Sequence, residues 1–173
     1  MRLIKVDKKS KYANDIKNIY LSSFPECERI GFEELINCKF PNSTVLGVFD
    51  KQTLIGFTFV SLFGKFAYIV YLAIDKNQRN KGFGTMVLTE LSNFYSNYTQ
   101  VLCVEKPLSK GDLQTRRIGF YKRNGFNLAN FEFDFDGQNY YSMYKGSFNE
   151  QEFKNFLLVC FPACSNFKTI TIM

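Results

Sequence analysis

Residues 71–85, YLAIDKNQRNKGFGT, join an apolar stretch to a polar loop and then to a pair of glycines. The residues from Phe66 to Ile74 are almost all apolar, which is typical of a strand covered on both faces. From Gly82 to Tyr98, apolar residues recur every three or four positions, which predicts a helix over residues 82–98. The stretch therefore predicts a buried strand, a polar loop, and a helix that begins on glycine.

The start of this helix suits a phosphate group. Amides in the first turn of a helix have no partner within the helix, and they lie at the positive end of its dipole. Gly82 and Gly84 would let a ligand approach that backbone closely. The spacing matches neither the P-loop nor the dinucleotide-binding fingerprint, so both classes are excluded. Glycines that only cap or pack the helix are the alternative interpretation at this point.

The remaining pattern mixes strands with helices. Upstream, we expect strands at residues 2–6, 45–49 and 54–63, and helices at 11–23 and 32–38. Downstream, we expect a strand at 101–104, a helix at 113–123, a hairpin of strands 126–135 and 139–144 around Asp136-Gly137, and a helix at 150–160. A strand, a helix and a neighbouring strand favour one right-handed parallel crossover.

These elements predict one α+β (mixed α/β) domain over residues 1–173, with the segment from about residue 149 to 173 at its periphery. Its centre would be a twisted, mostly antiparallel sheet of about six or seven strands with one parallel β-α-β crossover, flanked by helices.

The chain contains no histidine. This excludes Ser-His-Asp and Cys-His nucleophile systems, HExxH zinc sites and histidine general bases together. Five cysteines without a CxxC pair are expected to be free thiols, and we expect no metal site. Any proton transfer must then use a carboxylate, a tyrosine, a cysteine, a lysine, water or the substrate itself.

The net charge is +6, and it has three interpretations: solubility, nucleic-acid binding, or attraction of a polyanionic small molecule. Lysines and arginines are scattered without a long basic run, which disfavours nucleic acid. No apolar run reaches about 18 residues, so we expect no membrane span. The start of the chain lacks the apolar stretch of a signal peptide, so we expect a cytoplasmic protein.

Two motifs resemble those of GNAT acetyltransferases. Arg79-x-x-Gly82-x-Gly84 matches the (Gln/Arg)-x-x-Gly-x-(Gly/Ala) motif of that family, and the segment 120–126, FYKRNGF, resembles its FYxxxGF segment. The order of expected elements agrees with the family from about residue 2 to residue 145. The resemblance implies an acyltransferase with a GNAT-like fold that moves an acetyl group from acetyl-CoA to a primary amine of a small molecule or peptide. The amine would attack the thioester directly, without a covalent enzyme intermediate.

The resemblance also implies the cofactor-binding residues. Main-chain groups of the motif would hold the CoA pyrophosphate, and main-chain groups of the preceding strand would pair with pantetheine. The Ile74 amide would stabilise the thioester oxygen. Gln114 stands where the family often has Asn, and its side chain could still reach the cofactor. The full set is Leu72, Ile74, Arg79, Asn80, Lys81, Gly82, Gly84, Thr85 and Gln114.

Tyr121 and Glu105 are the candidate catalytic residues. Tyr121 aligns with the tyrosine that protonates the departing CoA thiolate in the family; its alternative role is packing. Glu105 lies in a Val-Glu-x-Pro-like segment and is a candidate general base, or else an ordinary loop glutamate; Glu28 is the other candidate for the base. Arg117 stands where the family often has a small residue; with Arg116 it could meet CoA phosphates, but a solvated basic helix face accounts for both best.

The acceptor pocket would draw on the connection between the first two helices, through Phe24, Glu28 and Arg29, with an ordinary loop as the alternative. Two other functions compete with the enzyme: a non-catalytic CoA-binding module and a basic nucleic-acid-binding protein. The protein would act as a monomer or a homodimer on its amine acceptor.

Overall fold

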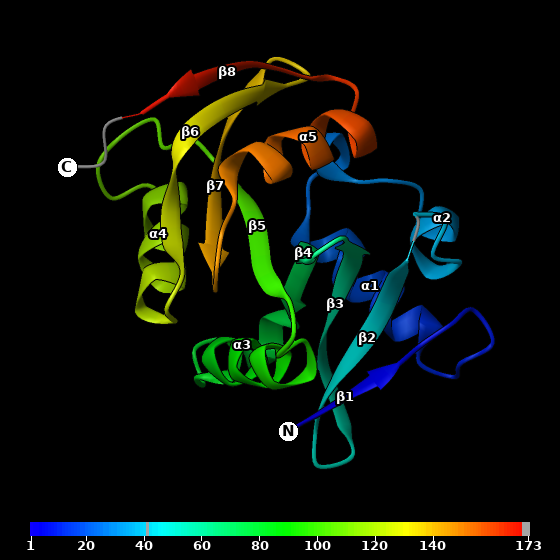
Figure 1. Cartoon of the computed structure of the whole chain (residues 1–173). Helices are drawn as coiled ribbons and strands as arrows, with labels where there is room; N and C mark the ends of the chain where they lie inside the picture. Colours follow the sequence, from blue (N-terminus) through cyan, green and yellow to red (C-terminus); the bar gives the residue numbers. More distant parts are fainter. Residues whose placement is uncertain (41, 171–173) are drawn as a thin grey trace. The chain divides into compact units, whose positions relative to one another are not determined.

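The computed structural model describes residues 1–40 and 42–170, and these fall into two compact units, one up to residue 96 and one from residue 97 onward. Figure 1 draws the chain with its helices and strands labelled. Each unit has its own antiparallel strands and its own hydrophobic core.

The first unit contains four strands and three α-helices among the described residues. Its elements are β1 (Arg2–Lys5), α1 (Ala13–Ser23), the 3-10 helix η1 (Glu26–Glu28), α2 (Phe32–Ile36), β2 (Ser43–Asp50), β3 (Thr53–Phe63), β4 (Phe66–Ile74), the 3-10 helix η2 (Lys76–Gln78) and α3 (Phe83–Phe94). Strands β1 to β4 pair in chain order, and every pair is antiparallel.

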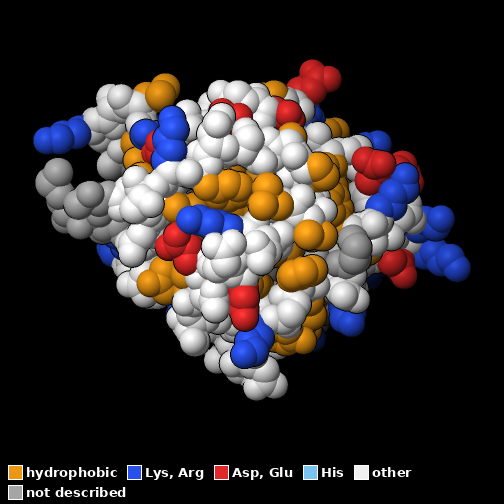
Figure 2. All heavy atoms as spheres, turned by 45° about the horizontal axis from the view of Figure 1, so that its top comes forward, with side chains coloured by type: hydrophobic (Ala, Val, Ile, Leu, Met, Phe, Trp, Pro, Cys, Tyr) orange, Lys and Arg blue, Asp and Glu red, His pale blue; other side chains and the backbone are white. Residues whose placement is uncertain are grey.

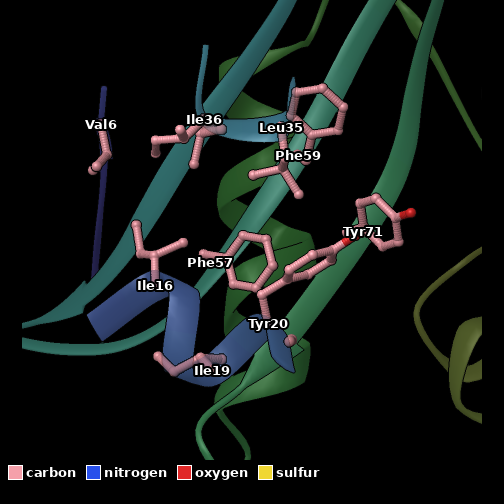
Figure 3. Close-up of a cluster of buried hydrophobic side chains, with 11 residues drawn as sticks. Val6, Ile16, Ile19, Tyr20, Leu35, Ile36, Phe57, Phe59 and Tyr71 are labelled. Carbon is pink, nitrogen blue, oxygen red and sulfur yellow. The ribbon is translucent and has the colours of Figure 1, made fainter. Parts of the chain in front are cut away.

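The core of this unit lies between α1 and the strands β3 and β4. Helix α1 turns Ile16, Ile19 and Tyr20 inward, which is the spacing of one helix face. All three belong to one buried cluster with Phe57 and Tyr71, and in Figure 3 the Tyr20 ring points toward these two strand residues. The Tyr20 ring makes edge contacts with Phe57 at 5.9 Å and with Tyr71 at 5.1 Å between ring centroids. Buried aromatic packing of this kind fixes α1 against the sheet.

Strand β4 carries a bulge in its middle. Phe59 pairs with Tyr71, but Val60 pairs with Ile69, so Val70 is an extra residue on β4. Beyond the bulge β3 and β4 approach closely at Gly56, where an added Cβ would lie 2.3 Å from the Ala73 carbonyl oxygen. Bulges bend and twist the strand that carries them, and here the bulge precedes the strand end that leads into the glycine loop.

The second unit contains four strands and two α-helices in the part of the chain described. They are β5 (Thr99–Glu105), α4 (Leu113–Arg123), β6 (Asn127–Phe135), β7 (Gln138–Lys145), α5 (Glu150–Cys160) and β8 (Cys164–Thr169). The strand order is β5-β7-β6-β8, all antiparallel. Asp136 and Gly137 both have positive φ, 50° and 81°, as the two-residue turn between β6 and β7 requires.

Most expected elements are present, with three differences. Helix α3 ends at Phe94 rather than near residue 98, because Ser96 and Asn97 form a turn after the Tyr95 amide has closed the last helical bond to Leu91. Strand β5 is longer than the apolar run that signalled it. Strand β8 has no counterpart in the sequence prediction, and it raises the strand count from seven to eight. Most of its residues are polar and exposed; Cys164 is buried, and Phe167 packs against Phe131 and Phe133.

Among the described residues, none of the helices combines the length and apolar character that crossing a bilayer requires. On the face displayed in Figure 2, acidic side chains are interspersed with the basic ones, and no continuous basic patch covers that face.

Candidate functional site

Helix α3 begins at a glycine in the left-handed conformation. Gly82 is its N-cap residue with φ 78°, and Asn80 just before it also has positive φ, 62°. An added Cβ at Gly82 would meet no atom within 4 Å, so the position needs glycine for its backbone conformation and not for lack of space. The space in front of this backbone is therefore open to a ligand.

Four successive amides at this helix start have no acceptor within residues 1–40 and 42–170: those of residues 82–85. The first intrahelical bond of the segment runs from the Met86 amide to the Gly82 carbonyl, at 3.3 Å. Unpaired amides at the positive end of a helix dipole favour an anion. The residues present therefore fit a phosphate group of the kind found in CoA.

The side chains of the loop hold it in place. Arg79 donates from Nε to the Ile74 carbonyl at 3.0 Å and from Nη2 to Ser23 Oγ at 3.1 Å. Lys81 Nζ donates to the Asn77 carbonyl at 3.2 Å and to Gln78 Oε1 at 2.9 Å. These bonds hold the loop backbone in front of α3, so the motif's basic side chains shape the loop while its amides stay exposed.

The end of β4 has main-chain groups that point away from β3. The Asp75 amide donates to the Ile55 carbonyl at 2.9 Å, which makes Asp75 a hydrogen-bonded partner of β3. In an antiparallel pair the bonded positions alternate, so the amides of Ile74 and Leu72 point to the opposite side. Both residues are partly buried. The cofactor-binding roles expected of Leu72 and Ile74 stay a prediction.

Tyr121 lies in the last turn of α4, and its side chain is half-buried. Its ring packs edge-on against Phe120 and Phe126, at 5.3 and 5.6 Å between centroids. Burial raises the pKa of the Tyr121 hydroxyl to about 12, although the Arg117 guanidinium acts in the opposite direction. Within the described residues the hydroxyl has no hydrogen-bond partner, so a protonated donor is available at neutral pH.

A model of the acetyltransferase (GNAT) family matches residues 13–126, more than half of the chain. The chain belongs to the GNAT acetyltransferase family. It is therefore an acyltransferase that uses acetyl-CoA, and the expected α+β fold is that of its family. No curated protein sequence matches the chain significantly.

Solved structures support the same fold. A putative GNAT-family acetyltransferase from Bacteroides thetaiotaomicron has a TM-score of 0.81 at 24% identity, over 92% of this chain and 97% of that one. The aminoglycoside 6'-N-acetyltransferase from Enterococcus faecium has a TM-score of 0.63 at 17% identity, over 84% and 96%. The PaiA N-acetyltransferase from Thermoplasma acidophilum, solved with coenzyme A, has a TM-score of 0.59 at 18% identity, over 84% and 98%.

In this GNAT chain, the connection from α1 to α2 is held by two tyrosines. The Tyr71 hydroxyl donates to the Glu28 carbonyl at 2.7 Å and accepts from the Ile30 amide at 3.3 Å. The Tyr20 hydroxyl donates to the Ile30 carbonyl at 3.1 Å. These bonds lie on both sides of Arg29, so they fix the peptide groups that carry it. Burial raises the pKa of both hydroxyls, which stay protonated and able to donate.

Phe24 belongs to the same cluster, with its ring 4.9 Å from that of Tyr71 and 5.6 Å from that of Tyr20. Glu28 and Arg29 are partly buried in the loop that follows. The structure therefore brings together Phe24, Glu28 and Arg29, the three residues expected to line the acceptor pocket. Tyr71 and Tyr20 were not predicted as site residues, because in the sequence both read as apolar positions of a strand and a helix.

Helix α4 presents three polar side chains on one face. Gln114, Arg117 and Tyr121 are spaced by three and four residues, which places them along the same side of the helix. Arg117 Nη1 donates to both carboxylate oxygens of Glu105, at 2.8 and 2.6 Å. Arg117 is thus an ion-pair partner of Glu105 rather than a freely solvated base, which differs from the expectation for that position. The sequence placed Glu105 near the site, but it held no signal for this pairing.

Proposed function

We propose that this enzyme transfers the acetyl group of acetyl-CoA to a primary amine of a small molecule or peptide, by direct attack of the amine on the thioester. The observation that carries this proposal is the run of four unpartnered amides at the start of α3, opened by a left-handed glycine. A site of this kind binds a pyrophosphate without side-chain charges. The family match spans residues from both compact units, which supports the proposal that residues 1–173 act as one acyltransferase domain.

The cofactor half of the proposed site is mainly backbone. The amides of Arg79, Lys81, Gly82, Gly84 and Thr85, with Asn80 in the same loop, hold the pyrophosphate. Main-chain groups of Leu72 and Ile74 pair with the pantetheine arm, and the Gln114 side chain adds a polar contact. The Ile74 amide donates to the thioester oxygen, where negative charge develops as the amine attacks.

The proton-transfer steps can be assigned to Tyr121, Glu105 and water. Acetyl-CoA supplies the acetyl group as a thioester. When the carbon–sulfur bond breaks, sulfur keeps the bonding electrons, and Tyr121 donates its proton to that sulfur. An acceptor that arrives as an ammonium ion must first lose a proton, and Glu105 and water are the candidates for this base. Because no covalent bond to the enzyme is needed, the absence of histidine is no obstacle to the reaction.

The acceptor half of the site is the loop held by Tyr71 and Tyr20. Phe24 offers an aromatic surface, Arg29 a positive charge and Glu28 a carboxylate in the partly buried loop. A carboxylate beside an aromatic ring suits a cationic amine. The similar enzyme from Enterococcus faecium acts on an aminoglycoside, which is a polycationic amine. We therefore propose a cationic amine as the acceptor.

The test combines binding with turnover. Calorimetric titration with CoA and acetyl-CoA is expected to show binding, and release of free thiol in the presence of a library of polyamines, aminoglycosides and lysine peptides is expected to show transfer. Absence of CoA binding at millimolar concentration would reject the cofactor site. Binding without thiol release for any acceptor in the library would reject amine acetylation.

A further inference from the structure

Glu105, the last residue of β5, has its charge compensated by Arg117. The Glu105 side chain is only 12% exposed, and both of its oxygens accept from Arg117 Nη1. A carboxylate removed from water in this way is stable as an ion only when a partner compensates its charge. The pair is therefore a fixed arrangement of β5 and α4, and not a loose surface contact.

Arg117 keeps part of its donor capacity. A guanidinium has five N–H groups, and only those on Nη1 are used for Glu105. The donors on Nε and Nη2 have no partner among residues 1–40 and 42–170, and the side chain is 36% exposed. Glu105 thus holds the Arg117 guanidinium in place, while its Nε and Nη2 donors stay unpaired within the described residues.

The Nε and Nη2 donors belong to the face of α4 that carries Tyr121. Arg117 precedes Tyr121 by four residues, which is one helical turn. The Arg117 charge favours the ionised form of the Tyr121 phenol, and the Glu105 charge opposes it to a smaller degree. On β6, the other strand that packs against α4, the buried carboxylate Glu132 is already paired with Lys106 at 2.7 Å. Arg117 and Glu105 are therefore the charges that act on Tyr121.

We propose that Arg117, held by Glu105, is a positioning residue that stabilises the negative charge on Tyr121 after proton donation, and that Glu105 acts through Arg117 and not as the general base. This inference rests on the proposed acetyl transfer. In that step sulfur receives the bonding electrons from the broken carbon–sulfur bond and a proton from the Tyr121 oxygen. The phenolate left behind is half-buried, so a cation one turn away lowers its cost until a solvent proton replaces the one transferred.

The same geometry argues against a base role for Glu105. Both oxygens of the Glu105 carboxylate accept from Arg117 Nη1, so an acceptor amine would have to displace this ion pair before it could deliver its proton to Glu105. Its lone pairs on the side of α4 are also in use. The proton of the acceptor amine then leaves to water.

Three variants separate the two roles of Glu105. Arg117→Met removes the cation, Glu105→Gln removes the carboxylate charge, and the double variant removes both, so that no unpaired charge is left buried. We expect Arg117→Met and the double variant to lose kcat by about 10-fold or more, with the KM for acetyl-CoA within a factor of about two. Glu105→Gln, which keeps the cation but weakens its anchor, is expected to lose clearly less kcat than Arg117→Met, and Arg117→Lys to recover part of the loss. Thermal unfolding of each variant checks that the fold is retained.

The pH profile gives a second readout. If Glu105 were the base, Glu105→Gln would be the worst of the variants, with a loss of about 100-fold or more and no acidic limb in kcat. We expect instead that the acidic limb is kept in Glu105→Gln. That variant is also expected to ionise Tyr121 at lower pH than the wild type, as measured by NMR with tyrosine labelled at the ring carbon that bears oxygen.

Coupling to Tyr121 decides the inference. In a Tyr121→Phe background, Arg117→Met is expected to cost nothing more in kcat. An equal loss in both backgrounds would overturn the inference, as would wild-type activity of Arg117→Met. Both outcomes require a wild-type enzyme that turns over, so they differ from failure of the proposed function, in which the wild type itself releases no thiol.

Discussion

The Tyr71 hydroxyl donates a 2.7 Å hydrogen bond to the main-chain carbonyl of Glu28, which lies 43 residues earlier in the chain. The same oxygen accepts from the Ile30 amide, so one side chain of β4 fixes the backbone on both sides of Arg29. Tyr71 is thus a link between the strand that leads into the cofactor loop and the connection proposed to bind the acceptor.

Tyr71→Phe tests this link. The ring contacts with Phe24 and Tyr20 are kept, but the Glu28 carbonyl and the Ile30 amide lose their partner, at a cost of about 1–3 kcal/mol in stability. We expect the KM for the amine to rise several-fold while the KM for acetyl-CoA is unchanged. Tyr12→Phe is the control, because the Tyr12 hydroxyl has no hydrogen bond within the described residues. Equal effects of the two variants on the amine KM would contradict the proposed link.

Gly82→Ala tests the helix start. A side chain at φ 78° strains the backbone by about 1–2 kcal/mol, and relaxing that strain moves the amides of α3. We expect CoA affinity to fall by about 10-fold or more in calorimetry. Gly64→Ala is the matched control, because Gly64 also has positive φ, 53°, and open space around its Cβ position. Both variants should lose stability, but only the first should lose affinity, and an unchanged Kd would refute the anion site.

Tyr121→Phe tests proton donation. Phenylalanine keeps the edge contacts with Phe120 and Phe126 and removes only the hydroxyl. We expect kcat to fall by about 10²-fold or more while CoA affinity stays within about twofold. Steady-state kinetics and calorimetry on the same preparation measure both. A large loss of affinity with kcat intact would assign Tyr121 to cofactor binding instead.

The stability of the protein at alkaline pH should depend on the ionisation of Tyr121. Burial raises the pKa of Tyr121 to about 12, against about 10 for an unfolded tyrosine. Above pH 10 the unfolded chain releases a proton that the folded chain keeps, so the contribution to stability is present below pH 10 and is lost as the pH rises toward 12. We expect the Tm to fall over this range in the wild type and to fall less steeply in Tyr121→Phe. Parallel Tm curves for the two proteins would contradict this account.

Gly56→Ala tests the close approach of β3 to β4. The added Cβ would lie 2.3 Å from the Ala73 carbonyl oxygen, and a backbone atom cannot move aside as a side chain can. We expect a loss of about 1–3 kcal/mol in the free energy of unfolding, measured by urea titration. At Gly31 the nearest atoms belong to the flexible Glu34 side chain at 3.5 Å, so Gly31→Ala is a control expected to cost much less.

The boundaries of helices and strands were predicted best where the apolar repeat was long and capping or turn residues marked its ends. The spacing of apolar residues predicted α4 and α5 to the residue, since Asp112 and Asn149 cap their starts through side-chain bonds. The Asp136-Gly137 turn was equally clear. Strand β8 could not be predicted, because its pattern is set by its pairing with the distant strand β6 and not by its own composition.

The site was predictable to a similar degree. Gly82 has a positive φ that favours glycine, and a sequence motif records such a backbone requirement directly. The pairing of Glu105 with Arg117 and the bonds of Tyr71 to the Glu28–Ile30 segment depend on tertiary contacts between distant residues. Contacts between residues so far apart in the chain produce no residue pattern that can be recognised in a single sequence.

The amides at the start of α3 have one more consequence. Every residue except proline carries the same N–H group, so this anion site constrains torsion angles and hardly constrains side chains. Most substitutions at Phe83 or Thr85 should therefore be neutral toward the cofactor, while few are tolerated at Gly82. Mutational drift and laboratory evolution can then change the acceptor loop without loss of cofactor binding, because that binding depends on the backbone conformation.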